Sequence, residues 1–123
     1  MVTCYNGNFK AYFYSEGYLR TSCREFTLNN LANRMVHLTN DAVQKKAEDY
    51  GKFEPGNKLS YSEFQSYIDK NHGGLNVCFE RDILPQIKKL TTDCFRASWG
   101  KMDPYKRFNT FECFGLDFMI DEQ

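Results

Sequence analysis

The stretch of residues 111–121 constrains the fold most strongly, because its apolar residues alternate with residues of other kinds. The alternating apolar positions are Phe114, Leu116, Phe118 and Ile120. A period of two places these side chains on one face of an extended strand. We therefore expect this stretch to be a strand that contributes an apolar face to a layered core.

Asp117 projects from the opposite face of the expected strand, where its neighbours Cys113, Gly115 and Met119 have no side chain that hydrogen-bonds a carboxylate. A buried, unpaired carboxylate is costly, so Asp117 requires a cation, a donor or a metal. The strand alone favours a structural salt bridge over a metal ligand in a cleft. A partner carboxylate on a following strand, usual at metal sites, is not expected because the sequence ends soon after Asp117.

The composition is that of an ordinary globular chain, with 123 residues, 41% hydrophobic and 26% charged. This length predicts one domain with its own core. The formal net charge is zero, so no overall field draws the chain to nucleic acid or to a membrane, and we expect neither as a partner. We recognise no signal peptide and no membrane-spanning apolar run.

The five cysteines form no pair with zinc-ligand spacing, and their odd number argues against a disulfide framework. Cys94 and Cys113 lie in apolar patterns, so we expect them to be small core residues. This usage fits a reducing cytosol.

The N-terminal part predicts an antiparallel meander, with strands at residues 2–4, 9–14 and 18–22 and a hairpin turn at residues 5–8. Residues 23–59 are expected to be mostly irregular, with a short helical turn near residues 28–33. Long ordered loops of this kind are usually functional or disordered.

Two helices are expected after this loop. Ser60 and Glu63 form a capping box, which predicts a helix over residues 60–70. A second helix is expected over residues 79–97, with its regular part beginning near Leu84 because Pro85 fits only in a first turn. Its buried stripe is predicted at Ile83, Ile87, Leu90 and Cys94. The order of elements predicts an α+β (or layered α/β) fold, in which an antiparallel sheet packs with two helices.

Two groups of residues are candidates for binding. Alternation places Arg20 on one strand face, from which a guanidinium can bind a phosphate or carboxylate with two parallel hydrogen bonds, although a surface arginine is the commoner case. His37, Thr39 and Asn40 can hydrogen-bond a nucleotide, or form a satisfied polar turn, which is again commoner. No glycine-rich phosphate loop occurs, so a nucleotide would be held by strands, side chains and metal.

Six segments together resemble successive motifs of the tubulin–tyrosine ligase and ligase-like family. They follow the family's order and cover nearly the whole chain. The segments are EGYLRTS (16–22), HLTN (37–40), VQKK (43–46), YGKFE with GN (50–57), ILPQIK (83–88) and FECFGLDFM (111–119).

This resemblance implies a partial ATP-grasp fold, in which residues 1–123 are the central and C-terminal part of a ligase domain that is incomplete at both ends. It implies ATP and Mg²⁺ as cofactors, with Asp117 as a Mg²⁺ ligand and Arg20 as the catalytic arginine that faces the phosphates and the reacting carboxylate. The residues implied to lie near the nucleotide are His37, Thr39, Asn40 and Lys45.

The implied activity is that of an ATP-dependent ligase that adds an amino acid to tubulin through an acyl phosphate. Glutamate is the first expectation, as in a tubulin polyglutamylase, and glycine or tyrosine are the others. The implied partners are tubulin or microtubules, with axonemal proteins as a further expectation, and the implied location is the cytoplasm and cytoskeleton, including the cilium or axoneme.

Several family motifs are missing from these residues: the Asp-x-Arg strand and nucleotide-binding lysines upstream, and the Glu-x-Asn metal motif downstream. We therefore expect an active full-length parent but an inactive isolated chain. The alternative is a non-catalytic ligase-like structural subunit bound to microtubules or the axoneme.

Overall fold

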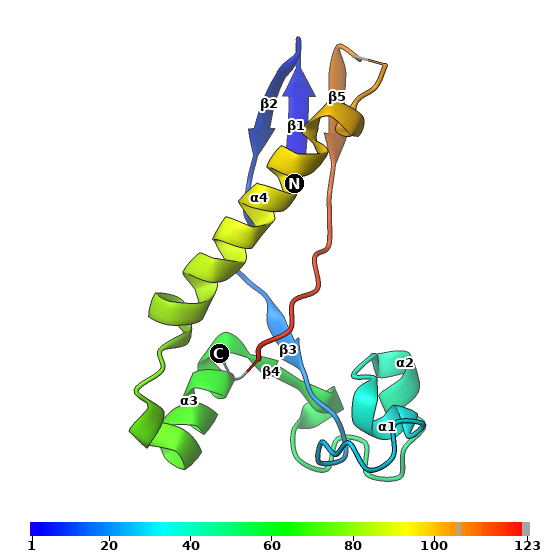
Figure 1. Ribbon diagram of the computed structural model, residues 1–123, viewed down its shortest axis with the longest axis vertical. Helices are drawn as coiled ribbons and strands as arrows, with labels where there is room; N and C mark the ends of the chain where they lie inside the picture. The colour runs from blue at the N-terminus through cyan, green and yellow to red at the C-terminus, as the bar shows by residue number, and fades with distance from the viewer. Residues whose placement is uncertain (106, 122–123) are drawn as a thin grey trace. The chain divides into compact units, whose positions relative to one another are not determined.

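The computed structural model describes residues 1–105 and 107–121, and it contains two compact units (Figure 1). The first unit combines Met1–Ser15 with Cys78–Gln123, and the second is Glu16–Val77. Each unit has an antiparallel sheet and helices. The predicted α+β class is confirmed.

The sheet of the first unit has three strands in the order β2-β1-β5. The central strand β1 (Val2–Tyr5) pairs antiparallel with β2 (Asn8–Ala11) and with β5 (Asn109–Glu112). The turn between β1 and β2 places Asn6 at φ 48° and Gly7 at φ 74°, as a type I′ hairpin requires. The predicted hairpin is confirmed, although β2 ends three residues before the predicted end. The predicted meander is wrong at its third strand, because residues 18–20 pair with residues 58–60 in a separate sheet.

The helix of the first unit begins with a π-helical turn (Phe79–Ile83) and continues as α4 (Leu84–Met102). Pro85 occupies its first turn, as predicted. The predicted buried stripe is wrong at Leu90, which is 55% exposed, and at Cys94, which is also exposed. The prediction is right at Ile83 and Ile87, which are partly buried. The other partly buried positions of α4 are Leu84, Thr91, Phe95, Ser98 and Met102.

Aromatic packing explains this rotation of α4. The ring centroids of Phe95 and Phe114 are 5.1 Å apart, and those of Trp99 and Phe9 are 4.0 Å apart. Such ring pairs contribute stabilisation beyond the area they bury. They hold the Phe95 side of the helix inward, so that Leu90 faces outward.

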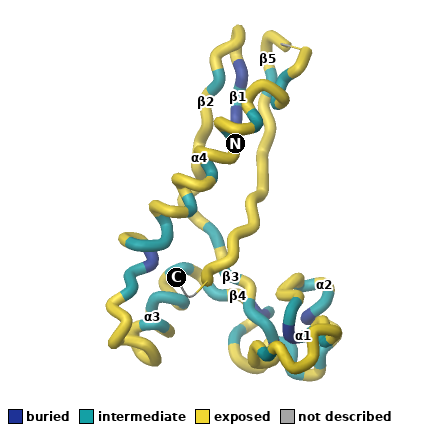
Figure 2. Tube along the Cα trace, in the orientation of Figure 1, coloured by how far each residue is buried: buried dark blue, intermediate teal, exposed yellow. Residues whose placement is uncertain are grey.

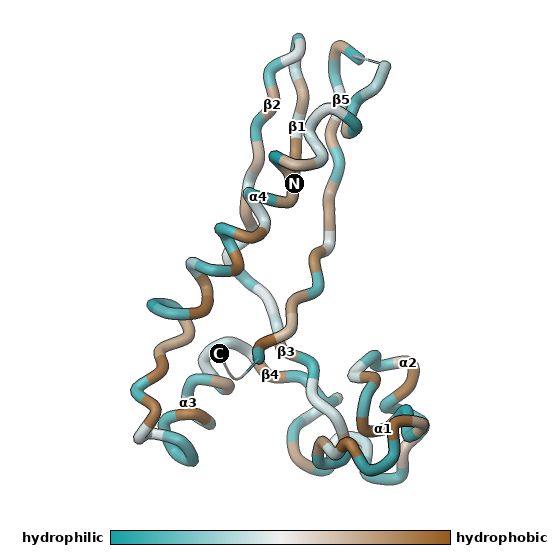
Figure 3. Tube along the Cα trace, viewed as in Figure 1, coloured by the Kyte–Doolittle hydropathy of each residue, from teal (hydrophilic) through white to brown (hydrophobic). Residues whose placement is uncertain are grey.

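The predicted strand over residues 111–121 is shorter than expected. Strand β5 ends at Glu112, and residues 113–121 pair with no other strand in the described part of the chain. Figure 2 shows this segment as exposed, and Figure 3 shows that hydrophobic and hydrophilic positions follow one another along it. The exposed fraction of the side chains still differs between the two faces of this segment, because Phe118 is 38% exposed and its neighbour Met119 is 98% exposed.

The predicted cysteine core is also wrong. Cys94 and Cys113 are exposed, whereas Cys4 and Cys23 are buried. An apolar pattern identifies a face of an element, but it does not show whether another element covers that face.

In the second unit, β3 (Tyr18–Arg20) pairs antiparallel with β4 (Lys58–Ser60), and Arg20 lies opposite Lys58. Helix α3 (Tyr61–His72) follows directly. The Ser60 side chain accepts a hydrogen bond from the Glu63 amide, and the Glu63 carboxylate accepts one from the Ser60 amide. The predicted capping box is therefore confirmed. A 3₁₀ turn (Gly73–Leu75) follows α3.

Residues 23–59 contain more regular structure than predicted. The elements are α1 (Arg34–His37), α2 (Asp41–Gln44), a 3₁₀ turn (Pro55–Asn57) and β4. The helical turn expected near residues 28–33 lies after Asn33 instead, because the Asn33 side chain caps α1 by accepting a hydrogen bond from the Met35 amide.

The core of the second unit is partly polar. Its buried residues are Cys23, Val36, Gln44 and Asn57. Buried polar groups are tolerated when they are hydrogen-bonded. In the described part of the chain, every buried side-chain nitrogen or oxygen has a partner. Separately, none of the helices in the described residues combines the length and apolar character that crossing a membrane requires.

Candidate functional site

The pairing of β3 with β4 brings two cationic side chains to one aromatic ring. The Arg20 guanidinium carbon lies 5.5 Å from the centroid of the Tyr18 ring, and Lys58 Nζ lies 5.4 Å from the same centroid. Arg20 also donates a hydrogen bond of 3.1 Å to the Tyr18 hydroxyl. Both cations are exposed, and each is in the range of a cation–π interaction.

Asp41, the first residue of α2, is an acidic residue whose pKa responds to the charges of these two cations. It accepts a 2.5 Å hydrogen bond from the Tyr50 hydroxyl, and its other oxygen lies 3.8 Å from Lys45 Nζ. The Tyr50 hydrogen bond is the largest cause that lowers the pKa of Asp41, and the charges of Lys58, Lys45 and Arg20 lower it further against the effect of burial. The same hydrogen bond raises the pKa of Tyr50.

We call Arg20, Lys45, Lys58 and Asp41 the Arg20 cluster. Three cations and one carboxylate give this cluster a positive balance within the second unit. A planar guanidinium beside an ammonium group can bind a phosphate or a carboxylate. Because the side chains are exposed, salt screens such binding.

Of the residues predicted to lie near the nucleotide, Asn40 and Thr39 directly precede Asp41 in sequence, whereas His37 makes other contacts. Asn40 occupies the N-cap position of α2, immediately before Asp41, and its side chain makes no capping hydrogen bond. Thr39 precedes it and is exposed. His37 is engaged elsewhere, because its Nε2 lies 3.0 Å from the Asn30 carbonyl and its ring packs edge-on against Phe26.

Lys45 thus pairs with Asp41, the charges of Arg20 and Lys58 act on the same carboxylate, and Asn40 precedes Asp41 in sequence. The binding roles of these residues stay predictions. Lys58, Asp41 and Tyr50 were not singled out from the sequence. The spacing of Asp41 and Lys45, four residues apart, was an available signal for an ion pair on a helix. Lys58 had no such signal, because its place depends on the pairing of two strands that are distant in sequence.

Asp117 lies in the first unit and is exposed. It makes no hydrogen bond or ion pair with residues 1–105 or 107–121, so the predicted salt bridge is not found there. Across the same residues, no three histidine, cysteine or acidic side chains gather to hold a metal ion. Mg²⁺ prefers a near-octahedral set of oxygen ligands. Asp117 alone does not form such a site.

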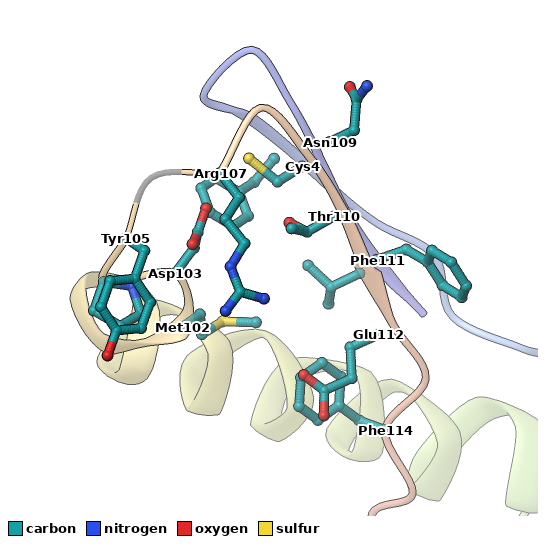
Figure 4. A pocket seen from close by; sticks show the side chains of 13 residues that line it. Cys4, Met102, Asp103, Tyr105, Arg107, Asn109, Thr110, Phe111, Glu112 and Phe114 are labelled. Atoms are coloured by element: carbon teal, nitrogen blue, oxygen red, sulfur yellow. The ribbon is translucent and has the colours of Figure 1, made fainter.

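The first unit also contains a pocket of about 390 Å³ between the end of α4 and the sheet (Figure 4). Charged side chains on its wall come from Asp103, Arg107 and Glu112, and apolar ones include Cys4 and Phe114. None of the residues predicted to bind nucleotide or metal lines this pocket.

The chain belongs to the tubulin-tyrosine ligase family, whose family model matches residues 1–123. The recognition made from the six motifs is therefore confirmed.

Three relatives share between 32% and 43% of their aligned residues with this chain. Tubulin glycylase 3A of Drosophila melanogaster is 43% identical over 115 residues, which cover 90% of this chain and 11% of the relative. The probable tubulin polyglutamylase TTLL9 of Mus musculus is 41% identical over 113 residues, which cover 92% of this chain and 23% of the relative. Protein monoglycylase TTLL8 of Homo sapiens is 32% identical over 113 residues, which cover 89% of this chain and 13% of the relative. The chain thus spans only a small part of the length of these relatives.

Proposed function

We propose that residues 1–123 are the central and C-terminal part of the ATP-grasp domain of a ligase that adds amino acids to tubulin. Membership of the tubulin-tyrosine ligase family supports this proposal, as do relatives that are named as glycylases and as a probable polyglutamylase. The activity is proposed for the full-length protein that contains this segment.

The observation that carries the proposal is the Arg20 cluster. In the proposed reaction, an acceptor carboxylate attacks the γ-phosphate of ATP and forms an acyl phosphate, with ADP leaving. The amine of the incoming amino acid then attacks the acyl carbon, loses a proton and displaces phosphate, which leaves an amide bond. Both steps require cations beside phosphate and carboxylate oxygens, and positioned cations are a main source of catalysis in phosphoryl transfer.

Within the second unit, we assign Arg20 to the phosphate or to the reacting carboxylate, because its guanidinium can donate two parallel hydrogen bonds. Lys45 and Lys58 supply further positive charge around the same ligand. Thr39 and Asn40 are proposed to contact the nucleotide from the segment before α2, and His37 to support that segment through its contact with the Asn30 carbonyl.

Mg²⁺ is proposed as a cofactor of the full-length protein, with Asp117 as one ligand. The other ligands would come from outside the described residues. The proposed cellular partner is tubulin or the microtubule, and the proposed location is the cytoskeleton, including the cilium and its axoneme.

The amino acid is proposed to be glutamate or glycine. The sequence-based expectation of glutamate agrees with the name of one relative, and glycine agrees with the names of others at similar identity. A direct test is to incubate the purified full-length protein with microtubules, ATP and labelled glycine, glutamate or tyrosine. ATP-dependent incorporation of glycine or glutamate into tubulin is expected. Microtubule binding without incorporation of any of the three would favour the non-catalytic structural subunit.

A further inference from the structure

Gln44 is the most completely buried side chain of the described residues, with 0% of its surface exposed. Its carboxamide oxygen accepts a hydrogen bond of 2.8 Å from the Cys23 amide. Its carboxamide nitrogen donates to the Leu38 carbonyl at 2.6 Å and to the Met35 carbonyl at 3.2 Å. A glutamine side chain offers an acceptor oxygen and two N–H donors, so these three bonds use both of its donors.

These hydrogen bonds connect three segments that carry the candidate site. Cys23 follows β3, the strand that holds Arg20. Met35 belongs to α1, and Leu38 immediately precedes Thr39 and Asn40.

Helix α2 and its C-cap carry two other members of the Arg20 cluster. Asp41 is its first residue, and Lys45 is its C-cap. A four-residue helix is not stable alone. Its place in the second unit therefore depends on tertiary contacts, of which the Gln44 hydrogen bonds are the most buried.

Neither close analogue of glutamine can replace these contacts. Glutamate would direct carboxylate oxygens at two carbonyl oxygens and bury a charge. Methionine would keep the approximate shape but would leave the Cys23 amide and the Leu38 carbonyl without their Gln44 partner. The Met35 carbonyl would keep its hydrogen bond from the Ser22 hydroxyl.

We propose that Gln44 is the positioning residue of the Arg20 cluster: it fixes α2 and the segment before it against the end of β3, so that Lys45 and Arg20 bind the same anion. This inference rests on the proposed function for the identity of the anion, a phosphate of ATP. Gln44 acts only through the backbone that it holds and does not touch the ligand.

The test compares Gln44→Glu and Gln44→Met with Asn57→Asp in the full-length protein. Asn57 is a matched control, because it is a buried amide of the same core, only 5% exposed. Its side chain accepts from the Gly51 amide and donates to Cys23 Sγ and to the Thr21 carbonyl. The partners of Asn57 lie outside residues 33–45, but Cys23 is also a partner of Gln44. A change from amide to acid at Asn57 therefore disturbs the core and this shared residue, while the hydrogen bonds from Gln44 to Leu38 and Met35 stay in place.

Calorimetric binding of ATP and hydrogen exchange of backbone amides are the two measurements. In the Gln44 variants, we expect the dissociation constant for ATP to rise about tenfold or more, since small displacements of binding groups are costly. Amides of residues 38–45 should exchange faster. With Asn57→Asp, we expect a change in the ATP dissociation constant of less than about threefold, with faster exchange near Gly51 instead.

The outcomes separate this inference from the proposed function. Equal weakening of ATP binding by the Gln44 and Asn57 variants, at equal loss of thermal stability, would show that Gln44 only supports the core. If Gln44→Glu does not fold, the ATP binding and thermal stability of Gln44→Met are compared with those of Asn57→Asp instead. A wild-type protein that binds ATP but modifies no tubulin would refute the proposed function alone, and one that binds no ATP would refute both.

Discussion

At the scale of single residues, Asp41 is the group on which several interactions of the second unit converge. It accepts a hydrogen bond from Tyr50 and pairs with Lys45. Its pKa is lowered, chiefly by the Tyr50 hydrogen bond, and the pKa of Tyr50 is raised, chiefly by the same bond. A lowered carboxyl pKa stabilises the fold above the unfolded value of 3.8 and loses that effect as the pH falls through the folded pKa. A raised tyrosine pKa stabilises it below 10.0 and loses the effect as the pH rises through the folded pKa.

The directions of these two pKa shifts predict how the stability of Tyr50→Phe depends on pH. This substitution removes the hydroxyl donor and little else. The melting temperature of the variant should be lower than that of the wild-type protein between about pH 5 and pH 9. The difference should shrink at lower pH, where Asp41 becomes protonated, and at higher pH, where Tyr50 becomes ionised. Melting curves across this range give the measurement, and a difference that stays constant from acid to alkali would contradict the account.

Lys58 gives the second prediction at this scale. Lys58→Glu reverses a charge beside Arg20, so it should weaken binding of ATP to the full-length protein about tenfold, the effect of losing one charged hydrogen bond of about 1.5 kcal/mol. Lys52→Glu is the matched control, because Lys52 is an exposed lysine of the same unit that contacts the Phe53 ring. Titration calorimetry of both variants measures the effect. Equal weakening by the two substitutions would indicate only a general charge effect.

At the scale of elements, the sequence predicted those features that depend on adjacent residues. The type I′ turn at Asn6 and Gly7, the capping box of Ser60 and Glu63, and the first-turn position of Pro85 all follow from local backbone chemistry. The short elements between residues 23 and 59 were missed. Helices of four residues and strands of three have little stability of their own, so tertiary contacts decide where they form.

Helix α4 illustrates the same limit and gives the third prediction. Helical spacing predicted an apolar stripe that included Leu90, but the ring contact between Phe95 and Phe114 turns another face inward. Phe95→Ala should lower the free energy of unfolding by about 2 kcal/mol, less than at a fully buried site because Phe95 is partly exposed. Leu90→Ala should change it by less than about 0.5 kcal/mol. Urea unfolding measures both free energies. A larger loss of stability in Leu90→Ala than in Phe95→Ala would show that the helix buries the face predicted from the sequence.

At the scale of the whole molecule, six motifs in order were enough to identify the family. They were not enough to build the site. Arg20 was a candidate from its residue type, and the resemblance to the family assigned its role and that of Lys45. Lys58 could not be chosen from the sequence, because the register of β3 against β4 is a contact between distant parts of the chain. The role of Asp117, in the other unit, remains a prediction from the resemblance.

The central claim is that Arg20 belongs to the working part of a tubulin-modifying ligase. The most direct measurement is the rate of labelled amino acid incorporation into tubulin by the full-length protein with Arg20→Lys, compared with Arg24→Lys. Arg24 is an arginine of the same unit whose contact is an exposed ion pair with Asp49. Lysine keeps the charge but lacks the planar two-donor group. We predict that Arg20→Lys lowers kcat/KM about a hundredfold and that Arg24→Lys leaves it unchanged. Full activity of a folded Arg20→Lys variant would contradict the claim.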